Sequence, residues 1–115
     1  MESKIIRMQR SIKDDLTEAA AALRKEMLVN AELVAENSHV ADDGQAIMLN
    51  FEKYYLRNGS YATLAVLLTD FGGIQTADIV GSGGGNGIFN ISWGANSEFA
   101  DDAADILRQM GFKED

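Results

Sequence analysis

The stretch that decides the fold is Ala46–Gly87, AIMLNFEKYYLRNGSYATLAVLLTDFGGIQTADIVGSGGGNG, in which two turn signals separate three apolar runs. The first signal, Asn58-Gly59, favours a two-residue hairpin loop, because both central residues of that turn need positive φ. It predicts strands over Ala46–Leu56 and Tyr61–Asp70. The pairs that face each other on one side of this hairpin are Leu49 with Leu68, Phe51 with Val66, Lys53 with Leu64, and Tyr55 with Ala62.

The second signal, Gly72-Gly73, predicts another two-residue loop, because glycine adopts positive φ without steric cost. It leads into a third strand, Ile74–Val80. A slip of one residue would turn the polar Thr76 and Asp78 toward the apolar face, so the pattern favours the two-residue loop. The expected pairs are Leu68 with Ala77 and Val66 with Ile79.

Two stretches have the spacing of amphipathic helices. Ser11–Leu28 begins with a Ser-x-x-Asp capping pattern and continues with apolar residues three and four positions apart. Asn96–Met110 has the same periodicity, with Asn96 or Ser97 as the expected N-cap. Gly111-Phe112 follows it, which is typical of a Schellman ending with its apolar contact.

The remaining segments are assigned from weaker signals. Lys4–Met8 alternates and predicts a short first strand, and Ala31–Glu36 predicts another. The polar stretch Asn37–Gly44 is interpreted as a loop. Gly81–Gly87 is expected to be a flexible connection into a further strand over Ile88–Trp93.

Together these elements predict a single α+β domain over residues 1–115. We expect an antiparallel β-meander sheet of five or six strands, with two amphipathic helices packed on one face. The core between the layers would contain Leu16, Leu23, Leu49, Phe51, Leu64, Val66, Leu68, Ile79, Phe99, Ile106 and Met110.

Composition excludes several classes of function. The net charge of −8 disfavours nucleic-acid binding, since a phosphate backbone would be repelled. The absence of cysteine excludes disulfides, thiol catalysis and cysteine-based metal sites, and no apolar run is long enough to cross a membrane. We expect an acidic, cytoplasmic protein with no nucleic-acid or membrane partner.

Catalytic and metal-binding residues are not expected. The single histidine, His39, lies near Glu36, Asp42 and Asp43, but this spacing matches no established metal-ligand pattern. Nothing in the sequence brings a serine nucleophile to His39. The glycine-rich segment matches neither dinucleotide-binding nor P-loop spacing. We therefore lean toward a protein that is not an enzyme and has no cofactor.

The outer face of the predicted sheet carries many large apolar side chains, which favours an interaction surface. The simplest hypothesis is a homodimer that pairs through this face. The candidate interface residues are Met48, Tyr54, Leu56, Tyr61 and Leu67, with Val80 on the same side.

The alternative hypothesis is a small-ligand-binding domain. Its pocket would lie between the sheet and the helices, with the glycine segment 81–87 as a lid. The candidate lining residues are Tyr55, Gly83, Gly84, Gly85, Phe89 and Trp93.

Two segments, Ser82-Gly83-Gly84 and Phe89-Asn90-Ile91-Ser92-Trp93-Gly94, carry a resemblance. With them, the chain resembles a family of small bacterial proteins of unknown function, found mostly in Firmicutes. In that family a short strand, a helix, a β-meander and a final helix follow one another. The insertion Gly85-Asn86-Gly87 departs from the family pattern, so the resemblance implies no shared role for this loop. It implies a fold and a bacterial, cytosolic setting, and transfers no catalytic residue.

Overall fold

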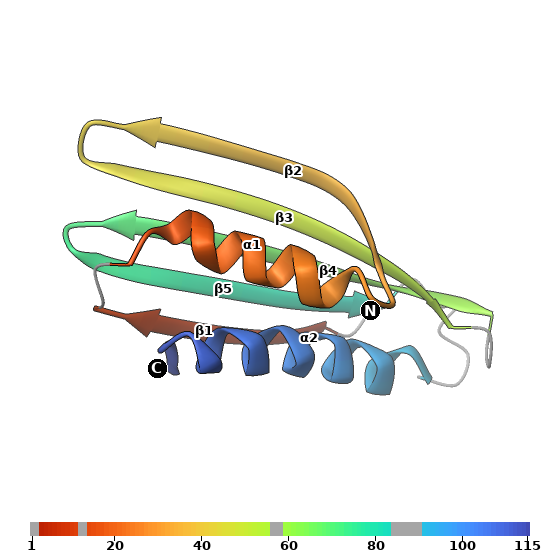
Figure 1. Cartoon of the computed structure of the whole chain (residues 1–115). Helices are drawn as coiled ribbons and strands as arrows, with labels where there is room; N and C mark the ends of the chain where they lie inside the picture. Colours follow the sequence, from red (N-terminus) through yellow and green to blue (C-terminus); the bar gives the residue numbers. More distant parts are fainter. Residues whose placement is uncertain (1–2, 12–13, 56–58, 84–90) are drawn as a thin grey trace.

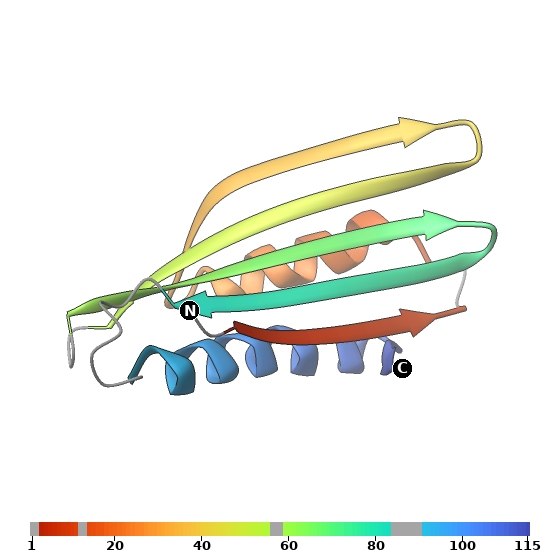
Figure 2. The ribbon, with the colours of Figure 1, turned by 180° about the vertical axis from the view of Figure 1, so that it is seen from behind.

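The computed structural model describes residues 3–11, 14–55, 59–83 and 91–115, and it contains one six-stranded sheet and two helices. The strands follow the order β2-β3-β4-β5-β1-β6, and all neighbours are antiparallel. Both helices cover the same face of the sheet (Figures 1 and 2), which confirms the expected α+β class. The elements are β1 (Ser3–Arg10), α1 (Leu16–Met27), β2 (Glu32–Ala41), β3 (Gly44–Tyr55), β4 (Ser60–Phe71), β5 (Ile74–Gly83), α2 (Ile91–Gln109) and β6 (Lys113–Glu114).

The hairpin of β3 and β4 differs in register from the prediction. Leu49 faces Val66 rather than Leu68, and Tyr55 faces Ser60, so the connection is two residues longer than a two-residue loop. Gly59 keeps the expected positive φ of 63°, and its N–H donates to the carbonyl oxygen of Tyr55 at 2.9 Å. A shift of two residues leaves every side chain on its predicted face, because side chains alternate with period two.

The hairpin of β4 and β5 has the predicted two-residue loop. Gly72 and Gly73 have φ values of 64° and 82°, a backbone conformation that residues with a side chain rarely adopt. Leu68 faces Ala77 and Val66 faces Ile79. The predicted register of this hairpin is therefore confirmed.

The edge strand β2 is longer than predicted. The segment 37–41, expected to be loop, continues the strand and pairs with β3, and only Asp42 and Asp43 form the turn. An edge strand exposes polar side chains at no cost, so the polarity of Asn37, Ser38 and His39 was misleading. A β-bulge at Val34 interrupts the pairing.

The glycine-rich segment begins inside the sheet. Gly81 and Gly83 are buried members of β5, opposite Leu64 and Ala62. The predicted strand Ile88–Trp93 is wrong for its last three residues, which begin α2, while residues 88–90 lie outside the described part. Both glycines lie on the face of the sheet that the helices cover and contribute no side chain to it.

Caps explain where α1 begins and where α2 ends. The N-cap predicted at Asn96 or Ser97 is wrong, because α2 already begins at Ile91. The predicted start of the first helix at Ser11 is wrong: α1 begins after Asp15, whose carboxylate accepts from the N–H of Thr17 at 3.0 Å. The predicted Schellman ending of α2 is confirmed, since Gly111 has a φ of 97° and the N–H of Phe112 donates to the carbonyl oxygen of Leu107 at 3.1 Å.

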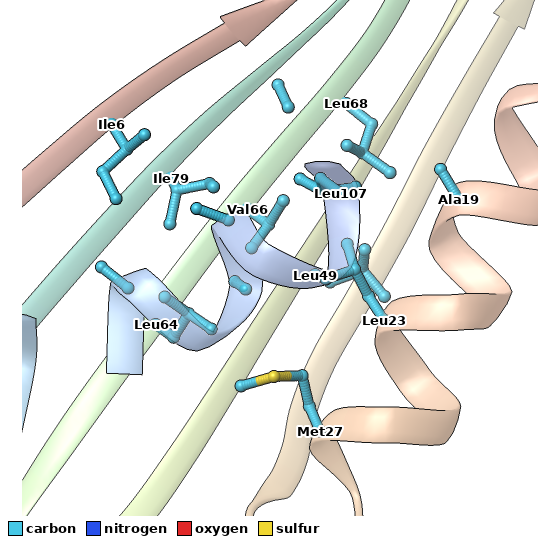
Figure 3. Packing of buried hydrophobic residues seen from close by; sticks show 14 of the residues in the cluster. Ile6, Ala19, Leu23, Met27, Leu49, Leu64, Val66, Leu68, Ile79 and Leu107 are labelled. Atoms are coloured by element: carbon cyan, nitrogen blue, oxygen red, sulfur yellow. The ribbon is translucent and has the colours of Figure 1, made fainter. Parts of the chain in front are cut away.

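The core lies between the two layers. Inward side chains of the sheet, such as Leu49 and Val66, lie beside Leu23 of α1 and Leu107 of α2 (Figure 3). The predicted core residues are all buried except Ile106 and Met110, which are partly buried. Further core members outside that list are Ile6, Met8, Ala19, Ala20, Met27, Ile47, Ala62, Ala77, Ala100, Ala103, Ala104, Leu107 and Phe112.

Two further features of the described residues bear on function. The short strand β6, which was not predicted, pairs with the end of β1 and brings Lys113 opposite Gln9. Neither described helix has the length and apolar character that a membrane crossing requires.

Candidate interaction face

The face of the sheet opposite the helices carries an unusual number of large apolar side chains. On each strand these residues alternate with core residues, so the pleat that builds the core also turns them outward. Their exposed fractions range from 39% for Leu67 to 61% for Ile5. The large apolar side chains exposed on this outer face are those of Ile5, Met48, Tyr54, Tyr61, Leu67, Phe71 and Ile74.

The middle of the outer face is a continuous apolar band. Met48 on β3 faces Leu67 on β4. Ala65 lies two residues before Leu67 on β4 and points to the same side. Ala65 in turn faces Val80, which faces Ile5 on β1. These five residues, here named the central band, cross the sheet diagonally from β3 to β1.

Aromatic residues lie toward both ends of the strands, on either side of the central band. Tyr54 and Tyr61 face each other, with ring centroids 4.8 Å apart and ring planes at 54°. At the other end of the strands Phe71 faces Ile74 beside the glycine turn. Polar rows separate both pairs from the band, and in one of them the hydroxyls of Thr69 and Thr76 are hydrogen-bonded.

The ring of Phe71 packs over Gly44, which has no side chain to displace it. The two residues face each other, and a Cβ on Gly44 would lie 2.0 Å from a carbon of the Phe71 ring. It would also lie 2.6 Å from the carbonyl oxygen of Asp70, which cannot move without distorting the ladder. Phe71 therefore covers the backbone at the end of β3 and presents its other side to solvent.

A hollow of about 460 Å³ borders the tyrosine pair at the edge of the sheet. Leu28 and Val29, in the turn after α1, line it together with Tyr54 and Tyr61. The exposed fractions are 49% for Leu28 and 79% for Val29. Sequence reasoning missed this pair, although two consecutive apolar residues beyond the buried stripe of a helix are a signal for surface exposure.

The predicted interface residues thus have a common location. Met48, Tyr54, Tyr61 and Leu67 lie exposed on the outer face, whereas Leu56 falls outside the described residues. Ile5, Phe71 and Ile74 share that face and were not among the candidates. Strand parity alone was enough to place them there.

Two of the predicted ligand-lining residues, Tyr55 and Gly83, lie at one end of the molecule. Tyr55 is half-buried on the helix side, and its hydroxyl is buried without a hydrogen-bond partner in the described structure. Gly83 ends β5 nearby, opposite Ala62. Gly84, Gly85, Phe89 and the side chain of Trp93 lie outside the described part.

The side chain of Tyr55 lies near charged side chains at this end of the sheet. Burial raises the pKa of the Tyr55 hydroxyl above its ordinary value of 10.0, and the carboxylates of Glu98 and Asp102 on α2 raise it further. The ammonium of Lys53 lies 5.0 Å from the centroid of the Tyr55 ring. The hollows beside Tyr54, Arg10, Val40 and His39 open at the surface, and a pocket between the layers stays a prediction.

Asp102 gives this end of the sheet a testable pH dependence. Burial raises the pKa of its carboxyl above 3.8, Glu98 raises it further and Lys53 opposes the change. Because the pKa of this carboxyl is higher in the folded protein than in the unfolded chain, its deprotonation costs more in the folded state. The free energy of unfolding therefore falls as the pH rises from 3.8 through the folded-state pKa. We expect Asp102→Asn to be more stable than wild type at pH 7, with the difference shrinking toward pH 4, as measured by urea unfolding. A difference that does not change with pH would contradict this.

The acidic segment around His39 does not form a metal site among the described residues. His39 lies exposed on β2, opposite Ala46. Glu36 points to the other face and accepts from Arg24 of α1 at 2.7 Å. The strand therefore separates the side chains that the sequence places close together.

Comparison with known proteins adds a family and no activity. The model of one family, described as "Family of unknown function (DUF6054)", matches residues 6–111. None of the curated proteins matches the chain. The expected relation to a family of unknown function is confirmed, while the bacterial source and the two-segment motif stay predictions.

Proposed function

The chain belongs to the DUF6054 family of unknown function, and we propose that it is a non-enzymatic interaction module that pairs with a second copy through the outer face of its sheet. The observation that carries the proposal is the set of large apolar side chains exposed on that face, with the central band at its middle. The central band is the contiguous part of this set, and monomeric proteins seldom expose large contiguous apolar patches. The proposed setting is the bacterial cytoplasm, which the family resemblance implies.

The size of the face supports a dimer. β3 and β4 have 12 residues each, and five neighbouring strands lie side by side. With a rise of about 3.3 Å per residue and a strand spacing of about 4.8 Å, the face measures roughly 900 Å². A stable interface buries about 800 Å² on each partner. One copy of the sheet therefore offers enough surface for a second copy.

The charge distribution also supports self-association. The chain has a net charge of −8, which opposes contact between two copies. On the described parts of β1 to β5, however, the outer-face positions carry only four formal charges, those of Arg7, Glu32, Glu52 and Asp78. Arg7 and Asp78 form an exposed ion pair at 3.9 Å. The outer face is thus nearly neutral, and two copies meet there with little repulsion.

The test is a substitution at the middle of the central band. We expect Leu67→Lys to raise the dimer dissociation constant by roughly 100-fold, because each dimer loses two apolar contacts worth about 1.5 kcal/mol apiece. The added lysine lowers the net negative charge, so general repulsion cannot explain a loss of pairing. Sedimentation velocity over a dilution series, from tens of micromolar to nanomolar, measures the constant.

Val40→Lys is the matched control. Val40 is 76% exposed on β2. Its side chain points away from the outer face, on which its neighbours His39 and Ala41 lie. The control makes the same change of charge away from the outer face and should leave pairing unaltered. Wild-type protein that stays monomeric throughout the dilution series would refute the proposal, as would equal weakening by both variants.

A further inference from the structure

A buried arginine lies at the opposite end of the molecule from Tyr55. Arg10, the last residue of β1, is 4% exposed. Its Nε donates to Oε1 of Gln75 at 2.6 Å, and its Nη1 donates to the carbonyl oxygen of Met110 at 2.6 Å. The guanidinium lies 4.5 Å from the centroid of the Phe112 ring. Arg10 therefore connects the end of β1 to β5 and to the end of α2.

The charge of Arg10 has no anionic partner among the described residues. The guanidinium of Arg10 donates to two acceptors, the side-chain amide of Gln75 and the backbone carbonyl of Met110. None of the described ion pairs includes Arg10. Asp70 is one step removed, since it accepts from Nε2 of Gln75 at 3.0 Å. The second terminal nitrogen, Nη2, is buried and has no hydrogen-bond partner. An unpaired buried charge and unused donors are costly, so this arrangement favours a negative group.

Arg10 also forms part of the wall of a hollow of about 520 Å³. Residues from the end of β1, the start of β5 and the C-terminal end of the chain line this hollow. Figure 1 shows these three parts of the backbone at the same end of the sheet. Its other lining residues are Gln9, Ser11, Ile74, Gly111, Lys113 and Glu114. A volume of several hundred cubic ångströms is typical of small-molecule sites.

The lining of this hollow is locally cationic in an acidic chain. Lys113 adds a second positive charge and, like Arg10, takes part in none of the described ion pairs. Glu114 is the only acidic side chain among the described residues of the wall, and its carboxylate is paired with Arg108, which also binds Asp105. Ser11 contributes a hydroxyl, and Ile74 contributes an apolar side chain.

From this geometry we propose that the hollow binds a small molecule through an oxyanion group, a phosphate or a carboxylate, held by Arg10 and Lys113. The oxyanion lies beside the buried guanidinium and supplies the negative charge that Arg10 lacks. Lys113 and Ser11 bind its remaining oxygens at the mouth of the hollow. Ile74 contacts the short apolar part of the ligand.

The experiment is a titration of the ¹⁵N-labelled protein with inorganic phosphate, and separately with acetate, at constant ionic strength set by sodium chloride. The readouts are the Nε–H signal of Arg10 and the backbone amides of Ser11, Gly111 and Lys113. We expect a saturable shift of these signals with at least one of the two anions. Saturation with phosphate alone or acetate alone identifies the group that the site selects.

Lys113→Gln keeps the length and polarity of the side chain and removes its charge. We expect it to weaken the anion by roughly fivefold, as befits an exposed charged contact. Lys25→Gln, which removes an exposed charge on α1, should leave the affinity unchanged. Arg10→Gln should abolish saturation, and the Lys113 variant keeps the test valid if Arg10→Gln does not fold.

Three results would overturn the proposal. Shifts that grow linearly and match those produced by chloride would show that no site exists. Equal weakening in the two lysine variants would reduce the effect to general electrostatics. An Arg10 Nε–H signal that does not move while distant amides do would place the anion elsewhere.

Discussion

Phe51→Ala should lower the free energy of unfolding by about 3–5 kcal/mol, the range found when a buried phenylalanine is truncated. Phe51 lies on the inner side of β3, faces Leu64 and is fully buried. Its removal leaves a cavity at the middle of the two-layer core, where the sheet cannot collapse inward without breaking its ladder. Urea unfolding followed by far-ultraviolet circular dichroism measures the loss.

A loss of this size is a large part of the 5–15 kcal/mol that stabilises a domain of this kind. The matched control is Val40→Ala on the exposed edge strand, for which a change within about 0.5 kcal/mol is expected. Equal losses in the two variants would mean that the inner side of β3 is not the core.

Gln75→Leu should cost about 3 kcal/mol, the second large effect expected in this chain, because it deprives a buried charge of its hydrogen-bond partner. Gln75 is 2% exposed, accepts from Arg10 and donates to the carbonyl oxygen of Asp14 at 2.6 Å. Leucine fills a similar volume, so the loss reports the hydrogen bonds rather than a cavity. Urea unfolding at pH 7 measures it.

A double-mutant cycle separates this effect from ordinary packing. Arg10→Met combined with Gln75→Leu replaces both polar partners by apolar groups and leaves no orphaned charge between them. We expect the double variant to lose less stability than the sum of the single variants, with a coupling of about 1–3 kcal/mol. Strictly additive losses would show that Arg10 and Gln75 do not act as a unit.

The alternation of apolar and polar residues was sufficient to predict which side of each central strand faces the core. It placed Phe51, Val66 and Ile79 inward, and it turned Met48 and Leu67 outward. It could not reveal the two-residue shift between β3 and β4, because such a shift exchanges partners without turning any side chain over. The pairing of Tyr54 with Tyr61 was lost for the same reason.

Elements at the margins of the sheet carry no such pattern. Both faces of β2 are largely exposed, so its sequence has no period that marks it as a strand. In β5 the buried positions 81 and 83 are glycines, which read as a loop until α2 is placed against them. Ile91–Trp93 alternates like a strand and still begins a helix, because alternation over so few residues does not identify a strand.

The two candidate sites differ in how far the sequence could predict them. The outer face follows from strand parity, so most of its apolar residues were identified before the structure. The site at Arg10 depends on residues far apart along the chain, which sequence spacing does not bring together. Nothing in the local sequence distinguishes Arg10 from an exposed arginine at the end of a strand.

The sequence by itself determined the properties that depend on neighbouring residues along the chain: the inward and outward sides of the central strands, the glycine turn at Gly72-Gly73 and the ending of α2. These follow from backbone sterics and side-chain alternation, which act within a few residues. The tertiary structure alone decided the register of the first hairpin, the extent of β2 and the burial of Arg10. Those depend on which distant surfaces pack together, because burial and the balance of charge are set by contacts that local sequence does not encode.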